Sequence, residues 1–133
     1  MSERLKTWKK PEFDEKNMTR WNWMCQYNDN LKLGKHVDIG AFTYINARYG
    51  VEIEKNVQIG SHCSIYSHST IDDKKGNITI KENAKIGTHS TIMPSVTIGK
   101  NAVIGAYSFV NKDIPDETLA IGIPSKIIRK INE

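Results

Sequence analysis

Two histidines occupy nearly the same local sequence on either side of an interruption in a repetitive pattern. His68 lies in "YSHS" and His89 in "GTHS", and the segment "DDKKGN" between them supplies Asp72 and Asp73. An imidazole with a pKa near ~6.5 can remove a proton from a hydroxyl or an amine at neutral pH. A carboxylate can orient that ring or hold an amino group. We therefore take His68 and His89 as candidate general bases and the two aspartates as candidate substrate-binding residues.

A six-residue repeat indicates the elements that must hold these side chains. From Leu33 onward the first residue of each hexad is Leu, Ile or Val, the second is often glycine, and the fifth is usually small or β-branched. The complete hexads are "LGKHVD", "IGAFTY", "INARYG", "IEKNVQ", "IGSHCS", "IYSHST", "IKENAK", "IGTHST", "IMPSVT", "IGKNAV", "IGAYSF" and "VNKDIP". This period fits neither a helix nor an alternating strand. It predicts short strands joined by corners, three to a triangular coil, with stacked coils burying one core.

Two interruptions break the period, and counting places them close together. The hexad at Ile45 is followed by one at position 53 rather than 51, and the hexad at Ile71 by one at position 80 rather than 77. The first interruption, near residues 49–50, therefore adds two residues to the repeat, and the second, the loop 72–79, adds three. The count places both at about the same corner of neighbouring coils. Loops on one face of a solenoid commonly build its binding site.

The same count predicts a column of side chains beside the interrupted corner. Its expected members are Arg48, His68, His89 and Tyr107, whereas His36 and His62 fall elsewhere. Fourth-position residues sit at corners, where left-handed backbone occurs and histidine is tolerated, so each histidine is equally open to a role as a solvated corner residue. The substrate-binding side chains expected at this corner are Arg48, Tyr49, Tyr66, Asp72 and Asp73.

Composition and charge narrow the class of protein. The 133 residues suggest one domain, and the net charge of +4 comes from scattered lysines rather than the clustered stripe typical of nucleic-acid binding. No apolar run is long enough to span a membrane, and "MSERLKTWKK" has no apolar signal core, so we expect a cytoplasmic protein. Cys25 and Cys63 make no disulfide framework. The fifth-position slot of Cys63 predicts a buried structural thiol rather than a nucleophile.

The hexads resemble those of the hexapeptide-repeat acyltransferases, in which an aliphatic residue and a glycine precede two variable residues, a small residue and one more. The resemblance covers Leu33 to about Arg129. The closing segment "VNKDIPDETLAIGIPSKIIRKI" is similar to the family's ending, "V-x-K-D-I-P" followed by "G-x-P-A-K-x-I", with Ser125 in place of the usual alanine. That ending points to the acetyl-CoA-dependent sugar and serine acetyltransferase branch.

The resemblance implies an all-β solenoid, a left-handed parallel β-helix of about four coils that assembles as a homotrimer. We expect an N-terminal helical or irregular cap over residues 1–32, the β-helix over 33–115 and a C-terminal extension over 116–133. The extension is expected to end in a short helix with Ser125 as its N-cap and Ile127, Ile128 and Ile131 on its apolar face. Such a helix would cover the open strand edges at the end of the solenoid.

The resemblance also implies that acetyl-CoA is the co-substrate, that no metal is needed, and that the acceptor attacks the thioester directly. The family's usual long loop with its Asp–His pair is missing here, so its pattern does not decide between His68 and His89. Coenzyme A would lie between subunits, with pantetheine near glycine-bearing corners and its phosphates near basic residues. The expected cofactor-binding residues are Gly87, Gly105, Ala106, Tyr107, Lys112, Pro124, Lys126 and Arg129.

The acceptor is open at this point. The first hypothesis is a sugar or a nucleotide-linked amino sugar used in surface polysaccharide synthesis, acetylated on oxygen or nitrogen. An enzyme of the same fold that acts on serine or an antibiotic is a second hypothesis. A third hypothesis is a non-catalytic β-helix. A fourth is a carbonic-anhydrase-like protein, which would hold zinc with histidines from adjacent subunits. The chain has four histidines, on at least two predicted columns.

Overall fold

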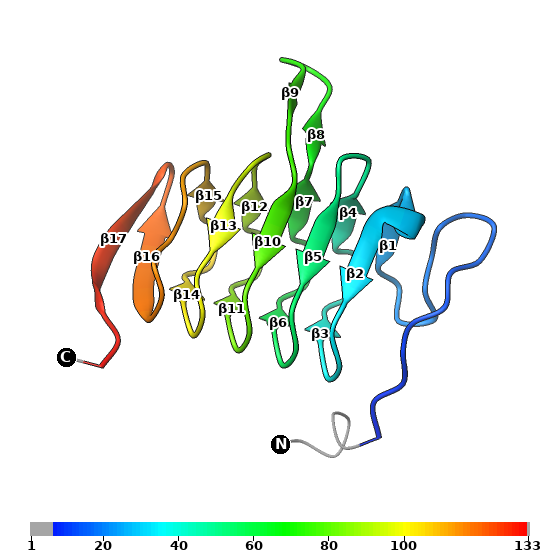
Figure 1. Ribbon diagram of the computed structural model, residues 1–133, viewed down its shortest axis with the longest axis horizontal. Helices are drawn as coiled ribbons and strands as arrows, with labels where there is room; N and C mark the ends of the chain where they lie inside the picture. The colour runs from blue at the N-terminus through cyan, green and yellow to red at the C-terminus, as the bar shows by residue number, and fades with distance from the viewer. Residues whose placement is uncertain (1–6, 133) are drawn as a thin grey trace.

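The computed structural model describes residues 7–132, which wind into a solenoid walled by three sheets of stacked strands (Figure 1). The first sheet contains β1 (Met24–Gln26), β4 (Tyr44–Asn46), β7 (Ser64–Tyr66), β12 (Thr91–Ile92) and β15 (Phe109–Val110). The second contains β2 (Leu31–Leu33), β5 (Val51–Ile53), β10 (Ile78–Ile80) and β13 (Thr97–Ile98). The third contains β3 (Asp38–Ile39), β6 (Gln58–Ile59), β11 (Lys85–Ile86), β14 (Val103–Ile104), β16 (Thr118–Gly122) and β17 (Ser125–Lys130). The ends of the two predicted flanking segments, residues 1–6 and 133, lie outside the described residues.

Each wall carries a column of aliphatic side chains that points into the shared core. In the first sheet Ile45, Ile65 and Ile92 are register partners on parallel strands, and all three side chains are fully buried. Burying one such side chain is worth roughly 1.5–3 kcal/mol, and one coil alone cannot bury it. The first-position aliphatic residues of the repeat therefore form the core, and the predicted all-β solenoid is confirmed.

Fourth-position residues turn the corners in the left-handed region of backbone conformation. One corner column consists of His36, Asn56, Asn83 and Asn101, with φ between 60° and 63°. A second consists of Phe42, His62, His89 and Tyr107, with φ between 57° and 66°. Neither Arg48 nor His68 has a positive φ, although both hold the fourth position of a hexad. These two residues have left the regular corners.

The longest coil shows where the repeat is interrupted. Contacts between adjacent coils join residues 18 apart at Ser90 and Ser108 but 27 apart at Ser61 and Thr88. The second interruption therefore adds nine residues to a coil, the difference between 27 and 18, rather than the three predicted. The expectation that Ile71 begins another wall was wrong, because its side chain is 96% exposed. Partial coils at β1 and β16 bring the solenoid to about five coils, rather than about four.

Aromatic side chains of the N-terminal segment cover the first coil. The ring of Phe13 packs edge-on against buried Trp23, with 5.5 Å between ring centroids. The indole N–H of Trp8 donates to the carbonyl of Val37 over 2.8 Å. Within residues 7–132 the helical structure amounts to the 3₁₀ turn η1 (Asn28–Asn30), so no helix in this part of the chain is long and apolar enough to cross a bilayer.

The C-terminal segment is a strand, and the predicted capping helix was wrong. Strand β17 pairs antiparallel with β16, with Ser125 opposite Gly122 and Lys126 opposite Ile121. A single isolated helix this short is marginal in water, whereas the open edge of β16 offers unpaired backbone groups and the β-branched Ile127 suits a strand. The segment covers the edge of the last coil, as expected, but does so by extending the third sheet.

Replacing Ile65 by alanine is expected to lower the free energy of unfolding by about 2–5 kcal/mol, because it leaves a cavity in a stacked wall. The matched variant Ile71→Ala removes the same atoms from an exposed side chain and should change that free energy by less than about 0.5 kcal/mol. Urea denaturation followed by circular dichroism measures both. Equal losses would contradict the placement of Ile71 outside the core.

Candidate functional site

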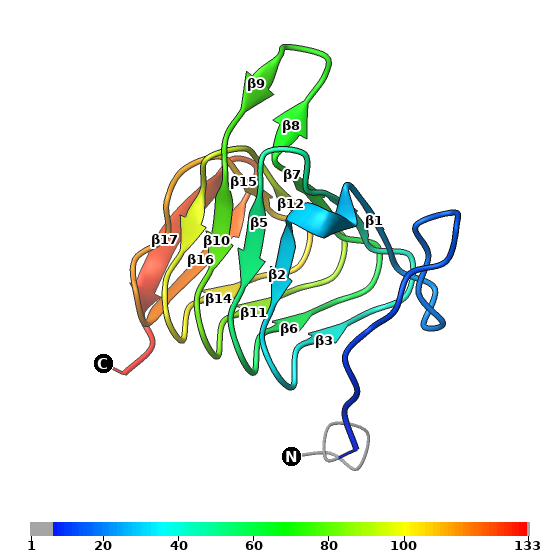
Figure 2. The ribbon, with the colours of Figure 1, turned by 45° about the vertical axis from the view of Figure 1, so that its right-hand side comes forward.

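One hairpin projects from the solenoid, at the corner between the first and second sheets. After β7 the chain leaves the wall, forms β8 (His68–Ser69) and β9 (Lys74–Lys75), and returns at β10. The two short strands pair antiparallel, with His68 opposite Lys75. Figures 1 and 2 show the hairpin standing clear of the stacked coils. The nine inserted residues therefore form an ordered projection that holds one of the candidate bases at its root.

His68 is held by an aspartate from the far arm of the hairpin. Its Nε2 lies 3.0 Å from Oδ1 of Asp73, and its side chain is 10% exposed whereas that of Asp73 is 72% exposed. The ring stands edge-on to Tyr49, with 5.2 Å between centroids. A neutral imidazole that donates from Nε2 keeps its lone pair on Nδ1, which is then the nitrogen that accepts a proton. The arrangement can orient a general base and stabilise its protonated form.

Neighbouring groups keep the hairpin acids ionised. The hydrogen bond from His68, with the Lys75 ammonium nearby, lowers the pKa of Asp73 below its ordinary value. The hydroxyl of Ser69 is the largest cause of a lowered pKa at Asp72. Both carboxylates are charged at neutral pH. Asp73 is the one placed to hold the imidazole.

The two-residue interruption places a second set of side chains at the same corner. The backbone N–H of Tyr49 donates to the Ser67 hydroxyl over 3.0 Å, which ties this corner to the root of the hairpin. The guanidinium of Arg48 lies over the Tyr49 ring, 5.5 Å from its centroid, and Lys75 lies 5.7 Å from the same centroid. The predicted neighbourhood of the two interruptions is therefore confirmed, and it brings Arg48, Tyr49, His68 and Asp73 together.

Asn46 is a site residue that the sequence analysis missed. It is buried, its Oδ1 accepts the backbone N–H of Arg48 over 3.1 Å, and its carbonyl accepts the backbone N–H of Ser67 over 2.9 Å. It therefore forms hydrogen bonds with the chain at both interruptions. One signal was present in the hexad "INARYG", where an asparagine occupies the position at which glycine is frequent.

The predicted column of Arg48, His68, His89 and Tyr107 was wrong in its first half. The ring of His89 stacks on His62, with 4.7 Å between centroids, and on Tyr107 at 4.8 Å. His68 follows β7 and His89 precedes β12, and these two strands pair in parallel. The two histidines therefore lie beyond opposite ends of the strands, one at the C-terminal end of β7 and the other at the N-terminal end of β12. The count failed because it allowed three additional residues between them where there are nine. Its last pair, His89 and Tyr107, is confirmed.

Residues expected to bind coenzyme A lie on the later coils. A Cβ atom on Gly87 would lie 2.5 Å from the backbone nitrogen of Ala106, and one on Gly105 would lie 2.4 Å from the side chain of Ile121. Close approach of the next backbone thus requires glycine at position 87, whereas a Cβ atom at position 105 would meet only the flexible side chain of Ile121. The remaining expected residues have exposed side chains. Tyr107 lies at the corner between the third and first sheets, Lys112 lies at the corner between the first and second sheets, and Pro124, Lys126 and Arg129 lie in the C-terminal segment.

The two thiols are core groups. Burial raises the pKa of the Cys63 thiol and raises that of Cys25 to about 12. Neither is therefore ionised to a nucleophilic thiolate at neutral pH. Across residues 7–132, no three histidine, cysteine or acidic side chains gather closely enough to hold a metal ion.

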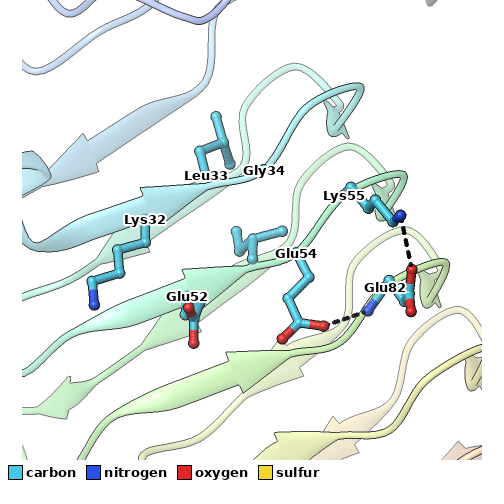
Figure 3. A pocket seen from close by; sticks show the side chains of 8 residues that line it. Lys32, Leu33, Gly34, Glu52, Glu54, Lys55 and Glu82 are labelled. Carbon is cyan, nitrogen blue, oxygen red and sulfur yellow. Dashed lines mark hydrogen bonds and ion pairs between the residues drawn. The ribbon is translucent and has the colours of Figure 1, made fainter.

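A separate hollow of about 510 Å³ lies on the face of the second sheet (Figure 3). The carboxylate of Glu54 accepts the backbone N–H of Glu82 over 3.0 Å, and the Glu82 carboxylate lies 3.6 Å from the Lys55 ammonium and 2.9 Å from that of Lys100. These acids hold adjacent coils together. The hollow has no oriented base comparable with the His68–Asp73 pair.

Comparisons with known proteins agree with this architecture. The family model described as bacterial transferase hexapeptide (six repeats) matches residues 77–112. Galactoside O-acetyltransferase from Escherichia coli K12 is 38% identical over 116 residues, which is 80% of this chain and 57% of that protein. Among solved structures, galactoside acetyltransferase in complex with coenzyme A superposes with a TM-score of 0.75 at 34% identity, covering 83% of this chain and 59% of the other.

A maltose O-acetyltransferase from Clostridium difficile 630 has a TM-score of 0.74 at 32% identity, covering 84% of this chain and 65% of that one. The chain spans somewhat over half the length of the curated relatives it matches. The similarity therefore covers most of this solenoid but not the whole of each relative.

In a His68→Ala variant, the pKa of Asp73 is expected to rise towards that of an ordinary aspartate, because the hydrogen bond that favours its charged form is gone. Lys74→Ala is the matched control, since Lys74 lies 3.8 Å from Asp72 rather than at Asp73. Carbon-13 NMR titration of the aspartate carboxyl groups measures both. An unchanged Asp73 pKa in His68→Ala would contradict the pairing.

Proposed function

The chain belongs to the bacterial hexapeptide-repeat transferases, and we propose that it transfers an acetyl group from acetyl-CoA to a hydroxyl group of a sugar. The observation that carries this proposal is the imidazole of His68, oriented by Asp73 at the hairpin that interrupts the repeat. Relatives named for O-acetylation of galactosides and maltose, one of them solved with coenzyme A, supply the donor and the acceptor class.

In the proposed reaction, His68 removes the proton of the acceptor hydroxyl as its oxygen attacks the thioester carbonyl. Asp73 stabilises the imidazolium that forms, because the carboxylate stays ionised. Collapse of the tetrahedral intermediate breaks the carbon–sulfur bond, and the imidazolium returns its proton to the departing thiolate of coenzyme A. Atoms and charge balance over the cycle, with an acetyl ester and free coenzyme A as products.

His68 is favoured over His89 as the base by its surroundings. The partner of His68 is a carboxylate, which fixes the orientation of the ring, whereas Nδ1 of His89 lies 2.9 Å from the hydroxyl of Thr88. His89 also carries parallel rings on both of its faces. We propose that His89 and Tyr107 form one wall of the groove that holds coenzyme A.

The separation of His68 from His89 across the first sheet favours a site formed between subunits. Within one chain, the hairpin and the third-to-first corner are separated by the first sheet, so His68 and the residues around His89 cannot meet the same thioester. We propose a homotrimer in which the hairpin of one subunit faces this corner of the next. Lys112, Lys126 and Arg129 would then bind the phosphates of coenzyme A.

The finer setting rests on the sequence resemblance. We propose that the acceptor sugar belongs to a surface polysaccharide and that the transfer takes place in the cytoplasm. An amino group as acceptor is the second form of the proposal. A neutral amine is already nucleophilic, so its acetylation would depend less on His68 than acetylation of a hydroxyl does.

Free coenzyme A released from acetyl-CoA tests the proposal, with galactosides, maltose, amino sugars and serine as acceptors. Transfer to a sugar hydroxyl is expected, and His68→Ala should lower its rate by about 10²–10⁴-fold because the base is lost. His36→Asn is the matched control. It exchanges a histidine at a distant corner for the residue type found at Asn56 in the same column, and the rate should be unchanged.

Three outcomes would contradict parts of this account. Transfer that survives His68→Ala but is lost in His89→Asn would move the base to the other corner. Transfer to serine alone would reject the sugar acceptor. If none of the acceptors led to release of coenzyme A, and if acetyl-CoA did not bind, the acetyltransferase function itself would be rejected.

A further inference from the structure

An arginine without a charge partner lies beside the oriented imidazole. The side chain of Arg48 is exposed, and among residues 7–132 it forms no ion pair. Its guanidinium carbon lies 5.8 Å from the ring centroid of Tyr27 and 5.5 Å from that of Tyr49. Two aromatic rings therefore position the guanidinium without neutralising its charge.

The charged groups of the hairpin already have partners. Asp73, which holds the imidazole, also lies 3.7 Å from the ammonium of Lys75, and Asp72 lies 3.8 Å from that of Lys74. Each of these pairs balances one positive charge with one negative charge. Arg48 is therefore a positive charge beside the hairpin that no acid of the hairpin neutralises.

A hollow of about 420 Å³ opens next to Arg48 and Tyr49, and its size falls within the range of small-molecule sites. Its charged members besides Arg48 are Lys32, Asp29 and Glu52, and its amides are Asn30 and Asn77. Neither acid is within ion-pair distance of Arg48 among the described residues. The amide of Asn30 donates to the Arg48 carbonyl over 3.1 Å, so the arginine backbone is fixed while its guanidinium stays available.

We propose that the acceptor is an acidic sugar whose carboxylate or phosphate is bound by Arg48 while one of its hydroxyls meets His68. Tyr49 connects the two groups, since the His68 ring stands 5.2 Å from its centroid and the guanidinium stands 5.5 Å from it. We expect a sugar bound beside this tyrosine to contact both groups. The guanidinium fork forms two parallel hydrogen bonds with either kind of anion. This inference rests on the proposed acetyl transfer and narrows its substrate class.

The test compares three acceptors that share one ring, namely methyl galactoside, methyl galacturonide and galactose 6-phosphate. For the full chain with acetyl-CoA, kcat/KM is expected to be at least about 10-fold higher for one of the two acidic sugars than for the neutral one, the range of a charge-assisted hydrogen bond. A preference for galacturonide identifies a carboxylate subsite, and a preference for the phosphate identifies a phosphoryl subsite. The variant Arg48→Gln should remove the preference, because kcat/KM for the preferred acidic sugar should fall by at least about 10-fold more than kcat/KM for methyl galactoside.

Two further variants separate charge from geometry. Arg48→Lys keeps the charge but loses the fork, and is expected to recover only part of the preference. Arg20→Gln is the matched control, because Arg20 also lies over an aromatic ring, 4.6 Å from the centroid of Trp21, but outside the hairpin corner. It should leave all three kcat/KM values unchanged.

The failures are distinguishable. A neutral sugar acetylated as well as both acidic sugars, or equal losses for all three acceptors in Arg48→Gln, would overturn the acidic acceptor and leave acetyl transfer standing. No release of coenzyme A with either acidic sugar, from a chain that acetylates maltose or another neutral sugar, would overturn this inference alone. No release with any sugar, together with no binding of acetyl-CoA, would overturn the proposed function with it.

Discussion

The in-register stacking of aliphatic side chains is the constraint on which the rest of this structure depends. Each coil buries its isoleucines only against the coils above and below, as Ile65 does against Ile45 and Ile92. An additional residue inside a wall would shift every later side chain out of the core. Insertions can therefore leave the solenoid only at corners. The nine additional residues do so as the β8–β9 hairpin, and the candidate catalytic residues lie where the repeat is interrupted.

The hairpin combines a buried imidazole with an exposed carboxylate. Its root is fixed by the solenoid, because Asn46 and Ser67 connect the two interrupted coils beneath it. Its far arm carries Asp73 into solvent, where the carboxylate stays ionised and still reaches the His68 ring. The rigid solenoid and its projecting hairpin thus hold the imidazole within hydrogen-bond distance of a carboxylate. Arg48 lies at the same corner, on the other side of the contact with Tyr49 from the imidazole.

The period of six was sufficient to predict the all-β solenoid, its core positions and the left-handed corners, because each follows from residue type at fixed spacing. It could not show that Ile71 lies outside the core, since an isoleucine at hexad spacing looks the same whether it is buried or 96% exposed. That ambiguity moved His68 into the wrong column. The C-terminal error had another cause, because the pairing of β17 depends on an edge of β16 that local sequence does not reveal. The neighbourhood of Arg48, Tyr49 and Asp73 was predicted correctly.

One deletion tests whether the interrupted corner is the catalytic one. Removing residues 68–76 joins Ser67 to Asn77 and leaves "IYSNIT", a regular hexad with asparagine at the corner position. We predict that this variant keeps the circular dichroism of the solenoid and still binds acetyl-CoA, while release of coenzyme A in the presence of a sugar acceptor falls by at least about 10²-fold. If the correctly folded deletion variant released coenzyme A at the wild-type rate, the account would be contradicted, because catalysis would then not need the hairpin.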